Sequence, residues 1–490
     1  MRKAIEPQIQ FGQVDISKIE FDLRSRDEIP KLLMGLQYIY CTPEIRAEVF
    51  EILEEMVPKG TAADKGRPGM LLWKIFVLGT LRLNCNWDYD KVKEMADHHD
   101  TLMMMLGHSR WEDEYRYPLQ TIKDNVSLFT PQILDKINQI VVQAGHNLVK
   151  KNEKLKGRCD SFVVETDVHY PTDINLLFDA MRKVIALIAG VCELVGLSGW
   201  RQSKHNIRKL KKLYRSAQRL KRSKAKKKGR AAKKNERIIR AHREYVAAAE
   251  WYLEKAKETL ALLVSGNQIK VIIHYMIEDY MRHADRQIDQ IKRRVLEGER
   301  IGHAEKVFSI FEEHTEWISK GKAGVPQELG LKVCVVQDQY GFILNHMVMR
   351  NAVDNKVAVP FVEETKRKFS ELGSCSFDKN FYSPANRKQL EGILDLAVMP
   401  KKGRLTEEDS ALESSESFAR ERRKHPAVES GINALENHGL DRCLDHGIKG
   451  FERYVAIAVV ARNIQILGTI LWETKLAKQK RKQAAFRKAS

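Results

Sequence analysis

The sequence lacks the features of secreted and membrane proteins. Its seven cysteines are scattered along 490 residues without a CxxC pair, so they indicate neither a zinc site nor a disulfide framework. The N-terminal stretch MRKAIEPQIQFGQ has no apolar run of the kind found in signal peptides. The most apolar stretches, 70–83 and 183–197, are shorter than about 18 residues and contain a charge, so neither is expected to span a membrane. We therefore expect a cytoplasmic protein in which these stretches form core helices.

Acidic residues are almost absent between residues 201 and 240. This segment contains 19 Lys and Arg but one acid, Glu236, for a local charge of +18, whereas the whole chain carries +19. The segment could simply be a solvated helical face, but unpaired like charges repel, and binding a polyanion relieves the repulsion and releases counterions. We predict that it contacts nucleic acid, and the candidate residues are Lys211, Lys212, Arg215, Arg219, Lys221, Arg222, Lys226, Lys227 and Lys228.

The first 150 residues have the apolar periodicity of helices. Thr42-Pro43 is a helix start with proline at the first helical position, and 70–83 continues as a buried helix. A short helix is predicted from Tyr89 to His98, and another from Thr101. Helices in such close succession permit either a helix-turn-helix that binds DNA or a plain helical bundle.

A strand and a large helical block follow. The stretch FVVETDVHY predicts a buried strand at 162–165 that leads to Asp167. Residues 174–298 then form an all-helical block, with a first helix over 174–195 and a final helix over 275–298. Between these two helices, we predict a hairpin of long helices that breaks near Gly229, with its Lys-rich part at the tip.

The pattern changes to β after this block. Strands are predicted at 327–338 and 342–350, within 372–383 as a strand that ends on Asp378, and at 394–400. Helices are predicted at 355–369, from Ser383 to Ile393, from Pro426 through Glu429, and at 450–472. The basic end, 475–490, is predicted to be disordered.

Without the helical block, the order is three strands, a helix, a strand, a helix, a strand and helices. This is the order of an RNase H-like fold, which brings the end of the first strand beside the end of the fourth. Three converging carboxylates suit Mg²⁺, which prefers hard oxygen ligands. Two such ions about 4 Å apart can activate an attacking hydroxyl and stabilise the leaving oxygen in phosphoryl transfer.

Five longer stretches of the sequence resemble those of a known protein family. The sequence resembles the DDE transposases of bacterial insertion sequences, of the ISNCY type, over roughly residues 70–470. The stretches that support the resemblance are LGTLRLNCNWDYDKVKEMADHHDTLMMMLGH, ETDVHYPTDINLLFDAMRKVI, EEHTEWISKGKAGVPQELGLKVCVVQDQYGFILNHMVM, SFDKNFYSPANRKQLEGIL and RRKHPAVESGINALENHGLDRC.

The resemblance implies a site and a domain organisation. Asp167, Asp378 and Glu429 match the catalytic triad and would bind two Mg²⁺ ions, for which Mn²⁺ could substitute. The expected fold is an α/β RNase H-like catalytic domain, a mixed sheet flanked by helices, with an all-helical N-terminal domain and a large helical insertion after the first strand. The expected boundaries are 1–150 for DNA binding or dimerisation, 158–173 with 299–474 for the catalytic domain, 174–298 for the insertion and 475–490 for the basic tail.

Neighbouring residues offer alternatives to this triad. Asp160 is expected to precede the strand in solvent, and Asp173 to cap the next helix. Glu436 lies on a face similar to that of Glu429 and is its substitute. The remaining polar residues near the triad have expected structural, surface or phosphate-binding roles: Asp338 at a hairpin turn, Asp354 as the cap of a helix, His169, His425 and His438 at the surface, and Arg420, Arg422, Arg423 and Lys424 beside phosphate.

The function implied by the resemblance is DNA transposition. The protein would bind the terminal inverted repeats of its element in the bacterial cytoplasm, at the nucleoid, as a homo-oligomer that pairs two ends. Water attack would free 3′-hydroxyl groups, which would then join target DNA. Two alternatives remain open: a metal-dependent nuclease of the same fold, and a non-catalytic DNA-binding descendant of a transposase.

Overall fold

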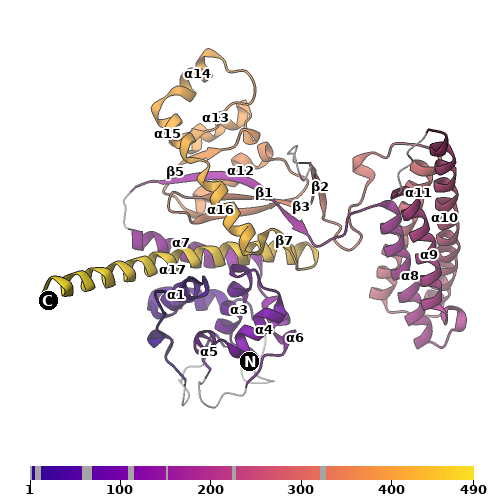
Figure 1. Ribbon diagram of the computed structural model, residues 1–490, viewed down its shortest axis with the longest axis horizontal. Coiled ribbons are helices and arrows are strands. Elements are labelled where there is room, and N and C mark those ends of the chain that lie inside the picture. Colours follow the sequence, from indigo (N-terminus) through magenta and orange to yellow (C-terminus); the bar gives the residue numbers. More distant parts are fainter. Residues whose placement is uncertain are drawn as a thin grey trace. The chain divides into compact units, whose positions relative to one another are not determined.

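The computed structural model describes residues 3–5, 13–57, 69–108, 115–149, 153–222, 228–319 and 327–489 (Figure 1). The chain divides into two compact units. One contains residues 1–167 and 318–490 and is called the sheet unit. The other, Val168–Trp317, is called the helical unit, and it extends beyond the expected insertion of 174–298 at both ends.

The sheet unit begins with helices, as predicted. Thr42 precedes Pro43 at the start of α2, and Asp88 caps α4 by accepting a hydrogen bond from the Lys91 backbone N–H. These helices are α1 (Ile29–Cys41), α2 (Pro43–Glu54), α3 (Leu72–Asn84), α4 (Tyr89–His98), α5 (Asp100–Met105), α6 (Leu119–Val126) and α7 (Pro131–Val149).

A seven-stranded mixed sheet follows these helices. Its main strands are β1 (Leu155–Thr166), β3 (Gln327–Gln337), β4 (Ile343–Met349), β5 (Leu372–Phe377) and β6 (Leu396–Val398). Their spatial order is β4-β3-β1-β5-β6. β3 lies antiparallel to both β1 and β4, whereas β1, β5 and β6 are parallel. The short strands β2 (Glu316–Ser319) and β7 (Arg442–Cys443) pair with β3 and β1.

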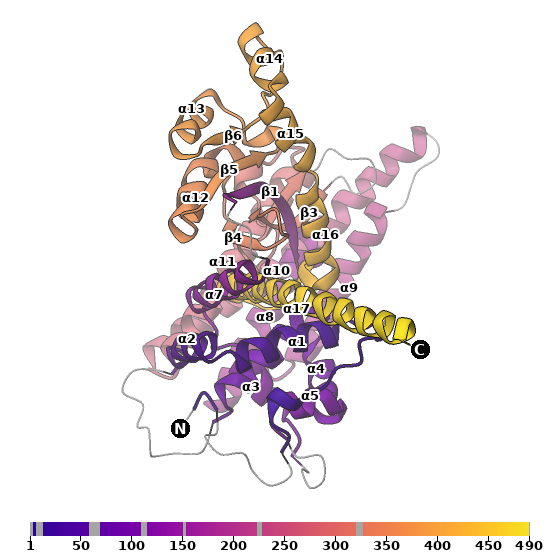
Figure 2. The same ribbon diagram turned by 90° about the vertical axis from the view of Figure 1, so that its left-hand side faces the viewer.

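Helices cover both faces of this sheet. In Figure 2, α15 and α16 lie on one side of the strands, and α12 and α13 lie on the other. The remaining helices of the sheet unit are α12 (Asp354–Lys368), α13 (Pro384–Ile393), α14 (Glu407–Ser414), α15 (Glu416–Lys424), α16 (Ala427–Leu435) and α17 (Gly447–Ala489). The structure is therefore mixed α/β, mostly helical, with one open mixed sheet.

The long helix α17 is a central part of the sheet unit. By length and composition α17 could cross a membrane, but 72% of its most apolar 18-residue window is buried inside the protein. It crosses α1 so closely that a Cβ at Gly468 would lie 1.8 Å from the Lys31 carbonyl oxygen. The predicted disorder of the basic tail 475–490 is wrong for its described part, since α17 continues as a helix to Ala489.

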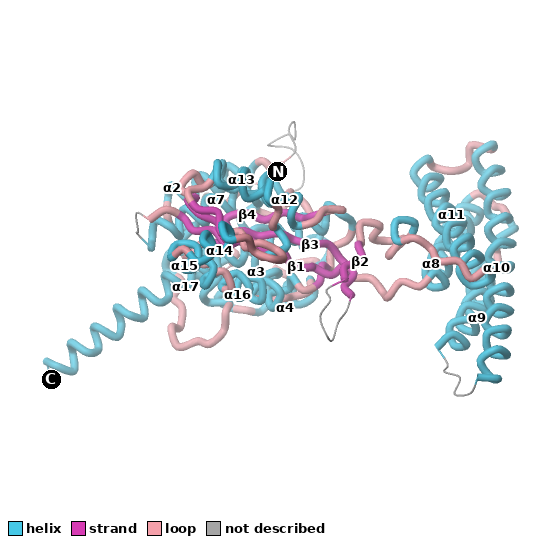
Figure 3. The backbone as a smooth tube through the Cα atoms, turned by 90° about the horizontal axis from the view of Figure 1, so that it is seen from above, coloured by secondary structure: helices cyan, strands magenta, loops and turns pink. Residues whose placement is uncertain are grey.

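The helical unit is built from four long helices packed side by side (Figure 3). They are α8 (Asp173–Leu194), α9 (Ser203–Arg222), α10 (Lys228–Ser265) and α11 (Val271–Ile291). Trp200, Tyr245 and Leu253 lie in their common core. The break of the helical hairpin is predicted near Gly229. In the structure α9 ends at Arg222 and α10 begins at Lys228, and residues 223–227 lie outside the described residues.

Single-turn elements complete the secondary structure. They are 3₁₀ turns at Ile16–Lys18, Ser198–Trp200, His303–Glu305 and Lys379–Phe381, and π turns at Lys292–Leu296 and Glu436–Leu440.

Candidate active site

The site begins with an aspartate in the middle of the sheet. Asp160 is the sixth residue of β1, which has β3 on one side and β5 on the other. In the parallel register of β1 and β5, Arg158 lies opposite Ser376 and Cys159 opposite Phe377. Continuing this register by one residue brings Asp160 beside Asp378, which directly follows β5. Because side chains alternate between faces, Arg158 and Asp160 share the face that carries Ser376 and Asp378.

Glu429 comes to this face from α16. It stands in the first turn of that helix, and its side chain is exposed. α16 contacts β1, and Gly431 lies so close to the sheet that a Cβ there would be 2.4 Å from Oε1 of Gln337. The absence of a side chain at Gly431 therefore lets α16 hold Glu429 near the sheet.

The electrostatics of Asp160 link it to the other two carboxylates. The pKa of Asp160 is raised to about 6, first by burial and then by the negative charges of Asp378, Asp354 and Glu429, while a hydrogen bond from the Ser161 backbone opposes the shift. Among the described residues, no ion pair involves Asp160, Asp378 or Glu429. Within the described part of the chain, the three carboxylates thus converge without an ion-paired cation, which is a destabilising arrangement unless a bound cation relieves it.

His425 lies beside the carboxylates. Its Nδ1 is 3.0 Å from Oγ of Ser376, which occupies the same sheet face as Asp378. Burial lowers the pKa of His425, although Asp378 and Glu429 oppose this shift. The ring is therefore neutral at pH 7 and not the fully exposed surface histidine that the sequence suggested.

The structure does not bring Asp167 to the site. Asp167 follows the end of β1, is exposed, and lies 3.8 Å from Nη1 of Arg442. The first carboxylate beside Asp378 and Glu429 is Asp160. Our prediction that Asp160 precedes the strand in solvent is wrong, because β1 begins seven residues before Phe162, at Leu155. The alternation of Lys156, Arg158 and Asp160 with less polar residues is a period-2 strand signal that could have identified it.

The other acidic candidates have structural partners. Thr172 caps α8, and Asp173 is the first residue of the helix, paired with Arg294 at 2.6 Å. Asp338 accepts hydrogen bonds from the backbone N–H groups of Tyr340 and Phe342, as a turn residue does. Asp354 is held by Ser161 and by Lys332. Glu436 begins a π turn after α16 and is not among the groups that shift the pKa of Asp160.

His169 and His438, the other two candidate histidines, have carboxylate partners outside the site. His169 is 2.5 Å from Asp179, and His438 is 2.8 Å from Glu28. Both contacts join a ring nitrogen to a carboxylate oxygen. Neither histidine is among the groups acting on Asp160.

The donor set of Asp160, Asp378 and Glu429 suits Mg²⁺. All three donors are carboxylate oxygens, and one face of the group is accessible through Glu429. Their oxygens do not all lie within 4.8 Å of one another, a spacing met among the described residues by Asp279, His283 and Glu313.

The compact group in the helical unit is already charge-paired. Arg282 contacts both Asp279 and Glu313, and His283 Nε2 is 2.5 Å from Oε1 of Glu313. Burial lowers the pKa of His283. Both carboxylates thus already contact a protein cation, Arg282, which distinguishes this group from Asp160, Asp378 and Glu429.

The predicted DNA-binding residues are exposed where the structure describes them. On α9, residues 211, 215, 219 and 222 follow helical spacing, so they share one side of the helix. The exposed members of the set are Lys211, Lys212, Arg215, Arg219, Lys221 and Arg222. Lys226 and Lys227 lie outside the described residues, and Lys228 opens α10.

The cations before Glu429 are partly neutralised. Arg422 pairs with Glu413 at 2.7 Å, and the nearest contacts of Arg420 and Lys424 are with Glu421 at 3.4 and 3.9 Å. Arg423 donates to the carbonyl oxygen of Ala419, so its charge has no carboxylate partner among the described residues.

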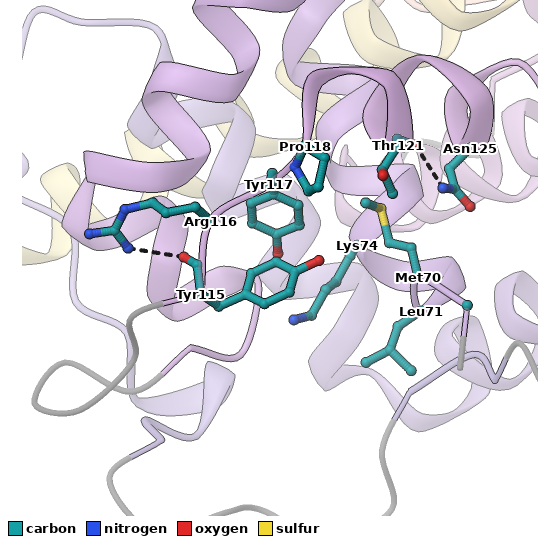
Figure 4. A pocket seen from close by; sticks show the side chains of 10 residues that line it. Met70, Leu71, Lys74, Tyr115, Arg116, Tyr117, Pro118, Thr121 and Asn125 are labelled. Atoms are coloured by element: carbon teal, nitrogen blue, oxygen red, sulfur yellow. Dashed lines mark hydrogen bonds between the residues drawn. The ribbon is translucent and has the colours of Figure 1, made fainter. Parts of the chain in front are cut away.

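A separate pocket lies among the N-terminal helices (Figure 4). Its volume is about 510 Å³, and aromatic and cationic side chains such as Tyr115, Lys74 and Arg116 line it. Among the described residues that line it, none carries a carboxylate.

Comparisons with protein-family models, curated proteins and solved structures found no match for this chain.

Proposed function

We propose that this protein is a metal-dependent DNA transposase whose active site is formed by Asp160, Asp378 and Glu429. The observation that carries the proposal is that these three carboxylates, which form no ion pair among the described residues, converge at one face of the sheet. The sequence resemblance supplies the reaction class, and the register of β1 and β5 supports Asp160 in place of Asp167.

The proposal includes an RNase H-like catalytic fold. The order β4-β3-β1-β5-β6, with β3 and β4 antiparallel to their neighbours and β5 and β6 parallel to β1, supports it. In this arrangement the first and fourth strands of the fold are β1 and β5. The first two carboxylates therefore come from adjacent strands, and a later helix supplies the third.

The protein's own residues would position DNA and metal. Asp160, Asp378 and Glu429 would hold two Mg²⁺ ions, which when bound lower the pKa of the attacking water and stabilise the leaving oxygen. The strand backbone fixes Asp160, and Gly431 allows α16 to bring Glu429 close. His425, neutral and anchored on Ser376, is placed to hydrogen-bond a phosphate oxygen or a water at the site.

The basic side of α9 would bind the DNA backbone. Its exposed Lys and Arg can neutralise phosphates without reading sequence. Arg423, which precedes Glu429 by six residues, is a second phosphate contact in this proposal.

The test is a strand-transfer assay with the DNA that flanks the coding sequence of this chain. With Mg²⁺ or Mn²⁺ the wild-type protein should cleave the element ends and join them to a target duplex. Asp160→Asn, Asp378→Asn and Glu429→Gln should each reduce both products by at least about 100-fold, because each removes a metal ligand.

Asp167→Asn is the matched control, since it removes a carboxylate seven residues from Asp160. It should retain activity within a few-fold of the wild type. Full activity of Asp160→Asn would contradict the assignment. Cleavage without joined products would identify a nuclease instead, and metal-independent binding without cleavage would identify a non-catalytic DNA-binding protein.

A further inference from the structure

One end of the helical unit exposes a concentration of large apolar side chains. Among the described residues, sixteen large hydrophobic side chains are exposed, and eight of these belong to this end. Singly scattered apolar residues are normal on protein surfaces, whereas a contiguous group marks an interaction site. The eight residues are Leu194, Leu197, Leu262, Val264, Val271, Ile272, Tyr275 and Met276.

The first two turns of α11 form an apolar ridge. Val271, Ile272, Tyr275 and Met276 follow the spacing of one helical face, and they are 44–70% exposed. Residues 271–277 include no Asp, Glu, Lys or Arg. The ridge is therefore an uncharged helical face without a partner inside the helical unit.

A groove lies beside the ridge, between α10 and α11. Its volume is about 710 Å³, and its lining residues on α10 follow one helical face, at 257, 260, 261 and 264. Apolar lining residues come from both helices, and they are Leu260, Ala261, Val264 and Met281. Two facing helices with an apolar floor form the kind of groove that accepts a third helix through its apolar face.

The charges around the groove are balanced. Lys257 and Arg282 line it together with Glu278 and Asp285, and Lys257 lies 3.3 Å from Asp285. An uncharged ridge can enter such a groove without leaving a like charge unpaired. An anionic or cationic partner would gain nothing from this rim, so the charge pattern favours an uncharged helix as the occupant.

The basic residues that begin α10, from Lys228 to Arg240, belong to the end of this helix opposite the apolar end. This helix is 38 residues long, from Lys228 to Ser265, so its ends are roughly 57 Å apart at 1.5 Å per residue. Two copies of the chain that meet at the apolar end keep these basic residues of α10 apart, which reduces the electrostatic repulsion between the copies.

We propose that the apolar end of the helical unit is the interface of a two-fold homodimer. The α11 ridge of one copy occupies the α10–α11 groove of its partner, and the reverse contact forms at the same time. Ridge and groove adjoin on the same helix, so a single two-fold axis satisfies both contacts. The inference goes beyond the proposed function and does not depend on it, because its test needs neither DNA nor metal.

The test is the mass of the full-length protein in solution at micromolar concentration, measured by sedimentation velocity. The wild type should be a dimer. Ile272→Glu combined with Tyr275→Glu should raise the dimer dissociation constant by at least about 100-fold, because it puts two charges into an apolar contact. Trp251→Glu is the control, since Trp251 is exposed on α10 outside the ridge and the groove, and it should remain dimeric.

A cysteine pair tests the geometry of the interface. A mixture of an Ile272→Cys chain and an Ala261→Cys chain should form an intermolecular disulfide under mild oxidation, above the background of the exposed native Cys41. Far-UV circular dichroism verifies that each variant is folded. A monomeric wild type would overturn the proposal, and so would a dimer that the double glutamate variant leaves intact.

Discussion

At the scale of single residues, the candidate site contains a carboxylate, Asp160, whose ionised form is destabilised by its surroundings. The pKa of Asp160 is raised from an ordinary 3.8 to about 6, so its ionised form costs free energy in the metal-free protein. Enzymes commonly accept such instability where charges must converge on a substrate or an ion. The positions of Asp378 at a strand end and of Glu429 at a helix start agree with the sequence prediction, whereas their roles remain part of the proposal.

A pH-dependent gain in stability should follow from removing this carboxylate. A raised acid pKa means that the folded state binds the proton more tightly, so stability falls as pH rises from about 4 to 6 and then levels off. The advantage of Asp160→Asn over wild type should therefore grow by about 1.5 kcal/mol between pH 5 and pH 8. Urea unfolding of both proteins in EDTA measures it.

Metal ions provide the control for this prediction. Added Mg²⁺ should stabilise the wild type at pH 8 and have a smaller effect on Asp160→Asn, since binding to the folded state alone raises its stability. If the difference in the free energy of unfolding between Asp160→Asn and the wild type were the same at pH 5 and pH 8, Asp160 would not titrate near pH 6.

Asp160 itself was not predicted from the sequence, for a physical reason. A central strand with both neighbours paired can contain polar residues on one face when that face forms a site. Lys156, Arg158 and Asp160 occupy that face, so the segment before Phe162 looked like a solvated loop. Because these charged residues alternate with buried ones such as Cys159, the segment lacks the continuous apolar run that predicted the strand at 162–165.

At the scale of elements, the position of α16 decides whether the third carboxylate reaches the site. Gly431 leaves no room for a side chain against Gln337, which is itself buried. Gly431→Ala should shift α16 or Gln337, and it should lower DNA cleavage by roughly 10-fold or more, because small misplacements of reacting groups are costly.

The same substitution elsewhere is the control for this effect. Gly392→Ala adds a Cβ that meets no atom within 4 Å, so it should leave cleavage unchanged. DNA affinity should be unchanged in both variants, since neither residue belongs to the basic segment. A loss of affinity in Gly431→Ala that parallels the loss of cleavage would argue against a positioning role.

Most elements were predictable because their local signals were strong. The helix expected at Tyr89–His98 and the helix starting beside Asp354 agree with α4 and α12. Helix caps, proline at the first turn and apolar periodicity supplied these boundaries. The strand expected at 162–165 is part of the longer strand β1, and the buried helix expected at 450–472 is part of the longer helix α17.

At the scale of the whole molecule, charge and apolar surface are separated. The basic side of α9 and the apolar ridge of α11 belong to different ends of one helical unit. The sequence predicts the first, because a charge run needs no tertiary structure to be recognised. It does not predict the second, since the exposure of Val271 and Ile272 depends on which face of α11 its neighbours cover.

DNA binding should depend strongly on salt through α9. Substituting Lys211, Arg215 and Arg219 with Gln together should weaken binding to any duplex and lower the slope of log affinity against log salt by up to about 3. Substituting the exposed lysines Lys91, Lys136 and Lys388 should leave the slope unchanged. An equal effect of both sets would mean that α9 has no special role.

The most direct test of the central claim is to locate bound Mn²⁺ in crystals by anomalous diffraction. We expect metal density coordinated by Asp160 and Asp378, with Glu429 at its edge. Density at Asp167, or at Asp279, His283 and Glu313 alone, would contradict the assignment of the active site.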